Sequence, residues 1–319
     1  DVGDHGNEVI QFLIDGQNLD GIYGGFGLVA MMNFRDDGQT VEFTYYATDK
    51  GKYMNAENQF TFTLPKQKED VAQVGENTYT TVTEAVANAG TDVVTILADT
   101  DEAITINADV TVDLAGCTLS SVTVAEGATL ALIDSATDDY QGEYGGAAIS
   151  GDVATFAEVD GKTYMVVSDS GVYSAHCYDV AITHISLKPA NDALGYKAQL
   201  LGDEVVQSHV KSLGFNLWVN DGSAKTYEKV ATSVTLRLQN ILAAGGGEMN
   251  IHATAFVTLA VGEETSLKTS AQQSTTMKDT LQTINAAWAD YSEAKQAAVK
   301  ELCDKFAVTK NWELTNILS

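Results

Sequence analysis

Positive charge is scarce in this sequence. Its 319 residues include 18 Lys and Arg against 44 Asp and Glu, which leaves a formal net charge of −26 at neutral pH. Proteins bind nucleic acids and anionic membranes by placing Lys and Arg against phosphates, so a surface this acidic argues against both classes of partner. The shortage is extreme between Glu69 and Gly161, where the chain contains no Lys, Arg or His.

Cysteine is also scarce, and long apolar runs are missing. Cys117, Cys177 and Cys303 are too widely spaced for a zinc or redox motif. We interpret them as small buried hydrophobes, and their redox state stays open. No apolar run is long enough to cross a bilayer, so we expect no membrane span. A start at Asp1 is typical of a processed, exported protein, although a trimmed chain would look the same, and we expect an extracellular or cell-surface location.

The most informative pattern is an 18-residue repeat between Asp92 and Asp134. Apolar residues spaced by two, the period of a β-strand, recur at this step. The matching positions are Val94, Val112 and Leu130; Ile96, Leu114 and Leu132; Ile104 and Val122; and Ile106 and Val124. Short strands at a fixed step are typical of stacked coils. We therefore predict a short right-handed parallel β-solenoid over residues 71–150, capped by a helix at Thr81–Ala89.

The rest of the chain also indicates a mainly β protein. An Asp-Gly turn at Asp36–Gly38 between two apolar runs predicts a hairpin, and residues 1–70 resemble a β-meander. Alternating runs separated by Gly, Asn and Asp predict an antiparallel β-sandwich over residues 151–272, with an inserted helix at Glu204–Leu213 behind an Asp203 cap. Residues 273–319 have helical periodicity, with Ser292 as an expected N-cap.

An apolar segment near the start of the chain has two interpretations. The run contains Val9, Ile10, Phe12, Leu13 and Ile14. It fits the first strand of the meander. It also fits a strand donated to a neighbouring subunit, which would make these residues an interface between copies of the chain.

The predicted solenoid lacks the groups that sugar-cleaving solenoid enzymes need. A lyase abstracts a proton beside a carboxylate, which requires a basic residue and usually calcium. The absence of cations between Glu69 and Gly161 argues against that chemistry. Hydrolysis by two carboxylates stays conceivable because Asp99, Asp101, Asp113 and Asp134 are present. Asp113 is interpreted as an outward-facing strand residue. We find no catalytic constellation and expect no enzyme.

Weaker signals suggest two kinds of ligand. The acidic insertion after the repeat offers the oxygen ligands that calcium prefers, although it lacks the regular alternation of an EF-hand loop and a solvated surface loop is the favoured interpretation. Its carboxylates are Asp134, Asp138, Asp139 and Glu143. Aromatic residues at Tyr140, Tyr144 and Trp218 are candidates for stacking on a glycan or for ordinary packing. His176 and His184 are interpreted as ordinary strand residues, and no other cofactor is indicated.

Two groups of segments resemble known bacterial modules. Tyr79–Val86, Val93–Leu97 and Val110–Gly116 resemble the pectate-lyase-like segments of modular bacterial surface proteins. Tyr173–Thr183 and Gly195–Ala198 resemble modules in secreted proteins of Gram-positive anaerobes. The resemblance implies an exported, modular protein and carries over no catalytic residue.

These observations together predict a non-catalytic structural or adhesive surface protein. Its expected partners are further copies of itself, joined into a filament by strand donation, or other surface proteins. The alternative is a secreted glycan-binding or glycan-cleaving protein of the pectate-lyase-like class.

Overall fold

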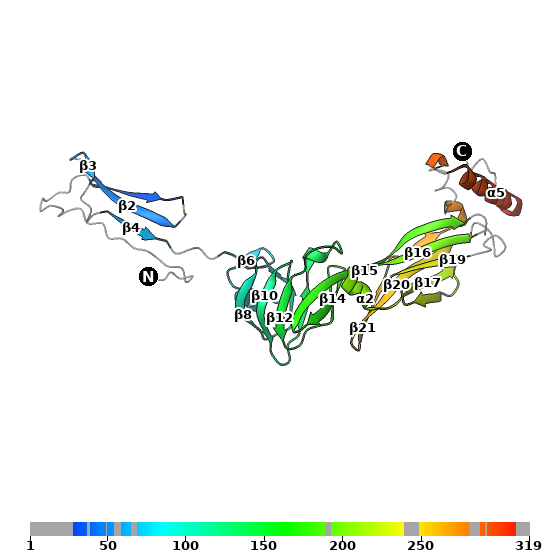
Figure 1. Cartoon of the computed structure of the whole chain (residues 1–319), viewed down its shortest axis with the longest axis horizontal. Coiled ribbons are helices and arrows are strands. Elements are labelled where there is room, and N and C mark those ends of the chain that lie inside the picture. The colour runs from blue at the N-terminus through cyan, green and yellow to red at the C-terminus, as the bar shows by residue number, and fades with distance from the viewer. Residues whose placement is uncertain are drawn as a thin grey trace. The chain divides into compact units, whose positions relative to one another are not determined.

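The computed structural model shows a mainly β chain with a few helices (Figure 1). It describes residues 28–36, 39–48, 50–53, 59–64, 69–188, 193–238, 249–280, 288–290 and 292–310. The chain divides into two compact units, Asp1–Glu69 and Asp70–Ser319, and each is described by itself. Within the described part of the chain, no helix is both long and apolar enough to cross a membrane.

The first unit contains an antiparallel sheet built around β2 (Thr40–Ala47). One edge of β2 pairs with β1 (Leu28–Phe34) in a register that sets Phe34 opposite Val41, so the predicted hairpin is confirmed. The other edge pairs with β3 (Lys52–Tyr53) and β4 (Phe60–Thr63). Val41 and Phe43 are buried on β2, which is therefore the apolar centre of this sheet.

The second unit opens with β5 (Ala72–Val74), β6 (Asn77–Tyr79) and helix α1 (Val82–Asn88). The helix matches the prediction closely. The Thr81 side chain caps it by accepting a hydrogen bond from the Glu84 amide, and Gly90 follows its end with φ near +57°. The Glu102 carboxylate accepts hydrogen bonds from the amides of Val82 and Thr83, which fixes the start of α1 to the strands behind it.

The repeat forms two ladders of parallel strands. One ladder consists of β7 (Val94–Ile96), β9 (Val110–Asp113) and β11 (Leu130–Ile133). The other consists of β8 (Thr100–Ile106), β10 (Thr118–Val124) and β12 (Gly146–Ser150), the strand that resumes after the insertion. We call these six strands the parallel stack. Their inward apolar side chains form one buried cluster, which α1 closes with Val82 and Ala85.

The 18-residue step is correct for most of the stack and wrong at one place. Ile104 pairs with Val122, Ile106 with Val124, and Val94 with Val112, each 18 positions apart. The third row differs, because Leu130 pairs with Val110 and Leu132 with Val112 at a step of 20. The shift is even, so the same side chains still point inward and Leu130 and Leu132 stay buried.

Carboxylates link neighbouring rows of strands in the parallel stack. Asp99 accepts a hydrogen bond from the Thr118 amide at 2.7 Å, and Asp109 accepts one from the Thr129 amide at 2.8 Å. Asp113 accepts from the Ser135 amide at 2.8 Å. Asp113 alternates with the inward Val112 on β9, as an outward-facing residue does, yet it is only 6% exposed because its carboxylate accepts hydrogen bonds from the Ala115 and Ser135 amides. The acidic composition of this region therefore has a structural use.

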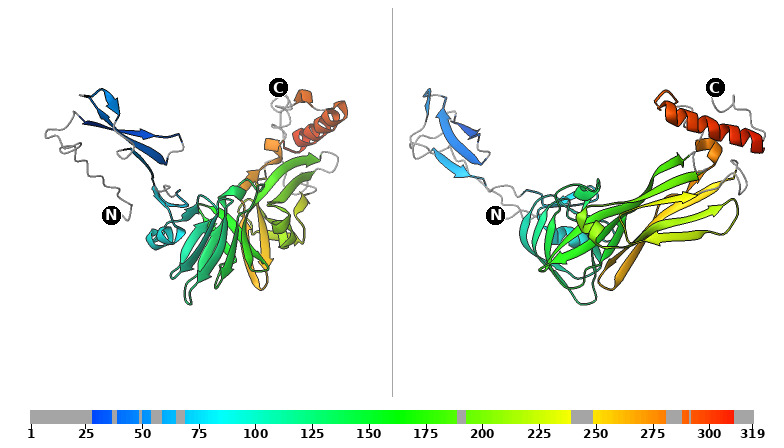
Figure 2. Two further views of the ribbon diagram at one scale, coloured as in Figure 1. Left: turned by 60° about the vertical axis from the view of Figure 1, so that its left-hand side comes forward. Right: turned by 45° about the vertical axis from the view of Figure 1, so that its right-hand side comes forward.

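Beyond the stack, one long strand is shared by two groups of strands. β15 (Val172–Lys188) pairs through its first half with β12 and with β14 (Lys162–Asp169). Its second half pairs with β16 (Ala193–Leu201), which in turn pairs with β19 (Ser233–Leu238). The green strand can be followed from the stack into the next layer in Figure 2. The short β13 (Phe156–Val159) completes this sheet beside β14.

A second antiparallel sheet packs with the far half of β15. It contains β17 (Val210–Val219), β18 (Lys225–Lys229), β20 (Ile251–Val261), β21 (Glu264–Thr269) and β22 (Gln273–Thr275). Side chains from both sheets form one buried cluster, with Tyr178 and Tyr196 from the first sheet and Phe215 from the second. The predicted helix behind Asp203 exists as α2 (Glu204–Ser208) but does not reach Leu213. The alternating residues from Val210 onward pair with β20 instead.

The described part of the C-terminal region is largely helical, as predicted. Helix α5 (Glu293–Lys310) follows the short 3-10 turn Trp288–Asp290, and the Ser292 side chain accepts a hydrogen bond from the Lys295 amide at its start. Met277 and Val299 belong to the cluster between the two sheets, so this region contributes to that core.

We expect the inward rows of the parallel stack to carry much of its stability. Leu132 is fully buried, so Leu132→Ala removes packing and leaves a cavity, and we expect a loss of about 2–5 kcal/mol in the free energy of unfolding. Leu97→Ala is the matched control, because Leu97 is 42% exposed. Urea denaturation measures both. Equal effects from the two variants would contradict the assigned inward row.

Candidate functional site

A polar cluster of four side chains joins three separate segments of the second unit. His176 and Ser174 lie on β15, Tyr144 lies just before β12, and Asp203 is the N-cap of α2. We call these four residues the Asp203 cluster. Ser174 and His176 are two positions apart on one strand, so their side chains point to the same face. The local folding of β15 and the cap of α2 thus bring together groups that are far apart in the sequence.

The cluster is a continuous chain of hydrogen bonds. The His176 Nδ1 lies 2.7 Å from an Asp203 carboxylate oxygen, and the His176 Nε2 lies 2.8 Å from the Ser174 hydroxyl. A carboxylate only accepts, so Nδ1 donates to Asp203, and the Ser174 hydroxyl, which can donate or accept, is the partner of Nε2. The Tyr144 hydroxyl donates to the same Asp203 oxygen, and its ring lies 4.3 Å from the imidazole. His176 is 3% exposed beneath it.

Asp203 is held as a carboxylate by these donors. Burial raises the pKa of Asp203, but hydrogen bonds from His176, Tyr144 and the Val206 amide outweigh this effect and lower the pKa to about 2. Burial, followed by the nearby Asp203 carboxylate, raises the pKa of the Tyr144 hydroxyl, which therefore stays protonated as a donor. Both partners are thus in the protonation state that the hydrogen bond requires across the neutral range.

The order of groups resembles a serine–histidine–carboxylate relay, yet each group also has a structural task. Asp203 uses one oxygen to cap α2 through the Val206 amide at 2.8 Å and the other to bind Tyr144 and His176. The aromatic ring of Tyr144 covers the imidazole. These contacts tie the segment before β12 to β15 and to α2. We therefore assign the Asp203 cluster a structural role, which is to hold the segment before β12, strand β15 and helix α2 together.

The acidic insertion does not assemble as a single ligand set. Asp134 is completely buried and accepts hydrogen bonds from the amides of Gly116, Ala136 and Gly145. Burial raises its pKa, which these three donors partly offset. The approach of Gly145 is close, because a Cβ there would lie 2.2 Å from a backbone oxygen, so glycine is required.

The other predicted calcium ligands have different surroundings. Asp138 accepts hydrogen bonds from Lys162 and from the Tyr164 hydroxyl, and Asp139 accepts one from the Gln141 amide. Glu143 is exposed. No group of three His, Cys, Asp or Glu residues suited to a metal ion occurs in the described ranges. Calcium binding by this insertion stays a prediction.

The three aromatic residues predicted to contact a glycan have different surroundings. Tyr140 packs against the small cluster of Ile133, Tyr164 and Cys177, and burial raises its pKa. Tyr144 belongs to the Asp203 cluster. Trp218 is half-buried on β17.

Trp218 has polar neighbours that suit contact with a sugar. It stacks on the imidazole of His252 in the next strand, with ring centroids 5.4 Å apart. The His252 imidazole also lies 2.7 Å from the Ser274 hydroxyl, which accepts a hydrogen bond from the Gln272 amide group. An aromatic ring beside hydrogen-bonding groups is a surface that a sugar could contact.

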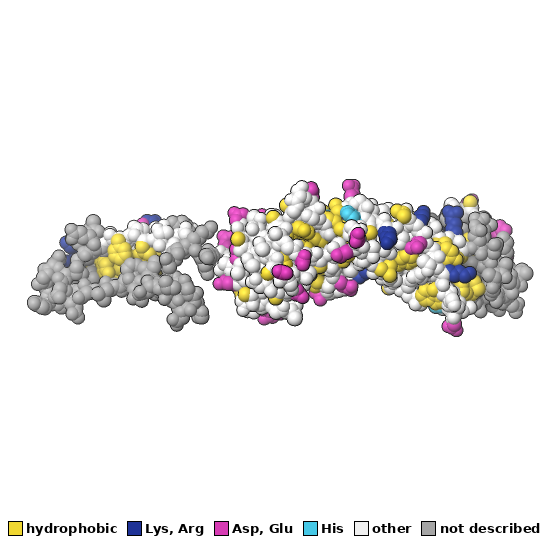
Figure 3. All heavy atoms as spheres, turned by 90° about the horizontal axis from the view of Figure 1, so that it is seen from below, with side chains coloured by type: hydrophobic (Ala, Val, Ile, Leu, Met, Phe, Trp, Pro, Cys, Tyr) yellow, Lys and Arg dark blue, Asp and Glu magenta, His cyan; other side chains and the backbone are white. Residues whose placement is uncertain are grey.

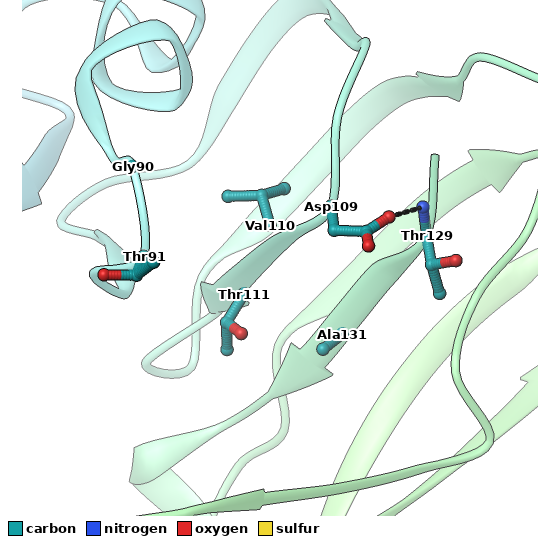
Figure 4. Close-up of a pocket in the computed structure, with 7 residues that line it drawn as sticks. All are labelled: Gly90, Thr91, Asp109, Val110, Thr111, Thr129 and Ala131. Carbon is teal, nitrogen blue, oxygen red and sulfur yellow. Dashed lines mark hydrogen bonds between the residues drawn. The ribbon is translucent and has the colours of Figure 1, made fainter. Parts of the chain in front are cut away.

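A shallow hollow of about 370 Å³ lies on the parallel stack beside the end of α1 (Figure 4). Its lining residues are Gly90, Thr91, Asp109, Val110, Thr111, Thr129 and Ala131. Asp109 turns toward the Thr129 amide and is used in that backbone contact, as the dashed line shows. None of the residues predicted to bind calcium or glycan lines this hollow.

The cysteines and the candidate donor strand differ in how far the structure describes them. Cys177 is buried and Cys117 half-buried, both as free thiols, and burial raises the pKa of Cys177 to about 11, which disfavours its reactive thiolate form. The side chain of Cys303 and all five candidate donor-strand residues lie outside the described residues. The five donor-strand candidates are Val9, Ile10, Phe12, Leu13 and Ile14.

Sequence reasoning missed the Asp203 cluster. His176 was interpreted as an ordinary strand residue because no orienting carboxylate could be assigned to it. Asp203 is 27 positions away and Tyr144 is 32 positions away, and no periodic pattern links the three. The available signal was the N-cap position of Asp203, which locates its carboxylate but not its partners.

No protein-family model, curated protein or solved structure matches this chain.

The depressed pKa of Asp203 makes a testable contribution to acid stability. Because its pKa is lower in the folded protein than the ordinary value near 3.8, the carboxylate stabilises the fold above about pH 4, and this stabilisation disappears as pH falls toward 2. We expect Asp203→Asn, which keeps the cap acceptor, to lose about 2 kcal/mol at neutral pH and to match the wild type near pH 2. Urea denaturation between pH 2 and pH 7 checks this. A pH-independent difference, or the same profile from Asp152→Asn on an exposed loop, would contradict it.

Proposed function

We propose that this protein is a non-catalytic extracellular or cell-surface structural protein, with an adhesive role or a role as a subunit of a self-assembling filament. In this proposal the parallel stack is a short right-handed β-solenoid, and the two antiparallel sheets beyond it form a β-sandwich. Both act as scaffolds. The support comes from how the acidic side chains are used.

The carrying observation is the engagement of the stack's carboxylates by its own backbone. Asp99, Asp109 and Asp113 accept amide hydrogen bonds from the next coil, and Asp134 accepts three. A glycan-cleaving site needs carboxylates directed at a substrate, or cations that neutralise one. These carboxylates instead stabilise the scaffold, and the same region lacks Lys, Arg and His.

Charge and strand sharing support an extracellular structural role. Acidic side chains cluster over the described face of the parallel stack, whereas Lys and Arg are seen beyond it (Figure 3). Such a surface favours solubility and repels nucleic acid. The shared strand β15 and the Asp203 cluster connect the stack to the next layer without a flexible linker. A continuous connection of this kind suits a protein that transmits force or spaces other modules.

Assembly in this proposal uses the apolar run from Val9 to Ile14 as a strand donated to a second copy. Its partners are further copies of the chain or other surface proteins. Five of its six residues are apolar, which favours burial in a sheet. Main-chain hydrogen bonds would supply the affinity, and the apolar side chains the specificity.

Deletion of residues 1–14 tests the proposed assembly. We expect the wild-type chain to form filaments in electron microscopy of purified protein and the truncated chain to stay dispersed, because the donated strand is gone. Deletion of residues 1–7 is the control, since it keeps the apolar run. Dispersed wild-type monomers at every concentration, or filaments of the truncated chain, would overturn the proposal.

Glycan binding is the second candidate, and the Trp218–His252 stack favours it. We expect Trp218→Ala to lower retention on any glycan that the wild type binds by roughly tenfold or more, because stacking on an aromatic ring contributes about 1–3 kcal/mol. A glycan array followed by titration measures this. Tyr227→Ala is the control, an aromatic that is 39% exposed on the neighbouring strand. Absence of binding by the wild type would reject this candidate.

A further inference from the structure

Strand β1 has an edge that no other strand of the described chain covers. It pairs with β2 from Leu28 opposite Ala47 to Phe34 opposite Val41, and with no further strand. In an antiparallel pair, backbone N–H and C=O groups point alternately toward the partner and away from it. The outward groups of β1 therefore form a row of donors and acceptors that can accept another strand.

The side chains of β1 make this edge unusual. Val29 and Met31 on one face are 44% and 37% exposed, and Met32 and Phe34 on the other face are 56% and 63% exposed. Hydrophobic atoms are visible on the described part of this unit in Figure 3. Edge strands are normally protected from pairing by charges, proline or a bulge. β1 has no charged residue and no proline, and its pairing with β2 is regular over seven positions.

We propose that the edge of β1 binds the Val9–Ile14 run of a second copy of this chain. The inference rests on the proposed assembly and identifies its acceptor. A strand added beside β1 would meet apolar side chains on both faces, so it should itself be apolar on both faces. The run Val9–Ile14 meets this requirement, because Gln11 is its one polar residue and it contains no charge.

Length and exposure support the same pairing. Six extended residues span roughly 20 Å, which matches a seven-residue acceptor strand. The β1 side chains are exposed in the single chain, so the apolar surface that covers them is supplied by another copy. Each copy then gives one strand and receives one, a head-to-tail contact that propagates as a filament.

A complementation experiment with full-length chains separates donor from acceptor. Val29→Lys with Met31→Lys puts two charges beside the acceptor edge and leaves the donor intact. Ile10→Asp with Phe12→Asp blocks the donor and leaves β1 intact. We expect each variant alone to sediment as a monomer. An equimolar mixture should give a heterodimer, in which the intact donor of the first variant pairs with the intact β1 edge of the second. The heterodimer should not extend, because the edge and the donor that it leaves free are the altered ones. Leu267→Lys, at an apolar residue that is 65% exposed on β21, should assemble like the wild type.

The outcomes distinguish failure of the acceptor from failure of the proposed function. If the Val29→Lys, Met31→Lys chain assembles like the wild type, β1 is not the acceptor and assembly by strand donation survives. If the wild type itself never assembles, both proposals fail.

Hydrogen exchange on unaltered β1 covers the case in which the lysine variant does not fold. We expect the outward amides of residues 28–34 to exchange at least roughly tenfold more slowly in assembled wild type than in the Ile10→Asp, Phe12→Asp monomer, because pairing protects them. Equal exchange rates would overturn the acceptor. Protection in a wild-type chain that sediments as a monomer would show that the chain covers its own edge, and would overturn the second-copy proposal.

Discussion

The hydrogen bond from a backbone amide to a carboxylate on a neighbouring row of the parallel stack is the interaction on which the second unit depends. Parallel strands in a stack leave amides unpaired at each turn, and a buried unpaired amide is costly. Asp113 satisfies the part-buried Ser135 amide and Asp134 satisfies three further amides, whereas Asp99 and Asp109 bind the exposed amides of Thr118 and Thr129. Glu102 does the same for the first amides of α1. The strongly acidic composition of residues 70–160 is thus partly a consequence of how this region closes its backbone.

The same chemistry recurs where the stack meets the antiparallel sheets. Asp203 caps α2 and accepts hydrogen bonds from Tyr144 and His176, so one carboxylate joins a turn, a strand and a helix. The neighbouring strand β15 passes through both groups of strands and makes the connection rigid at the level of the backbone. A relay-like order of Ser, His and Asp can therefore arise from structural demands alone, because a buried histidine needs a partner for each ring nitrogen.

The inward rows of the stack could be predicted from sequence, but the register of the last row could not. Strand periodicity identifies which face of β11 is buried, and Leu130 and Leu132 are indeed buried. A shift of two residues keeps every side chain on its face, so steps of 18 and 20 give the same pattern. The choice depends on the lengths of the two turns that flank β10, the strand between β9 and β11. For α2 the Asp203 cap was evident, whereas its end was not, because strand alternation from Val210 onward resembles a continued apolar face. The Asp203 cluster depends on contacts across 27 and 32 positions, which local patterns do not encode.

The two units handle their edges in opposite ways, and in the proposed assembly this contrast sets the direction of growth. In the second unit α1 closes one end of the stack, and the shared pairing of β12 with β15 continues the other end into the next sheet. In the first unit β1 keeps an uncharged, regular edge with apolar side chains exposed on both faces. A net charge of −26 makes copies of the chain repel one another at long range, so association requires a short-range contact rich in apolar surface and main-chain hydrogen bonds. An uncharged strand against an uncharged edge supplies such a contact. In the proposed assembly, repulsion elsewhere restricts association to that one geometry.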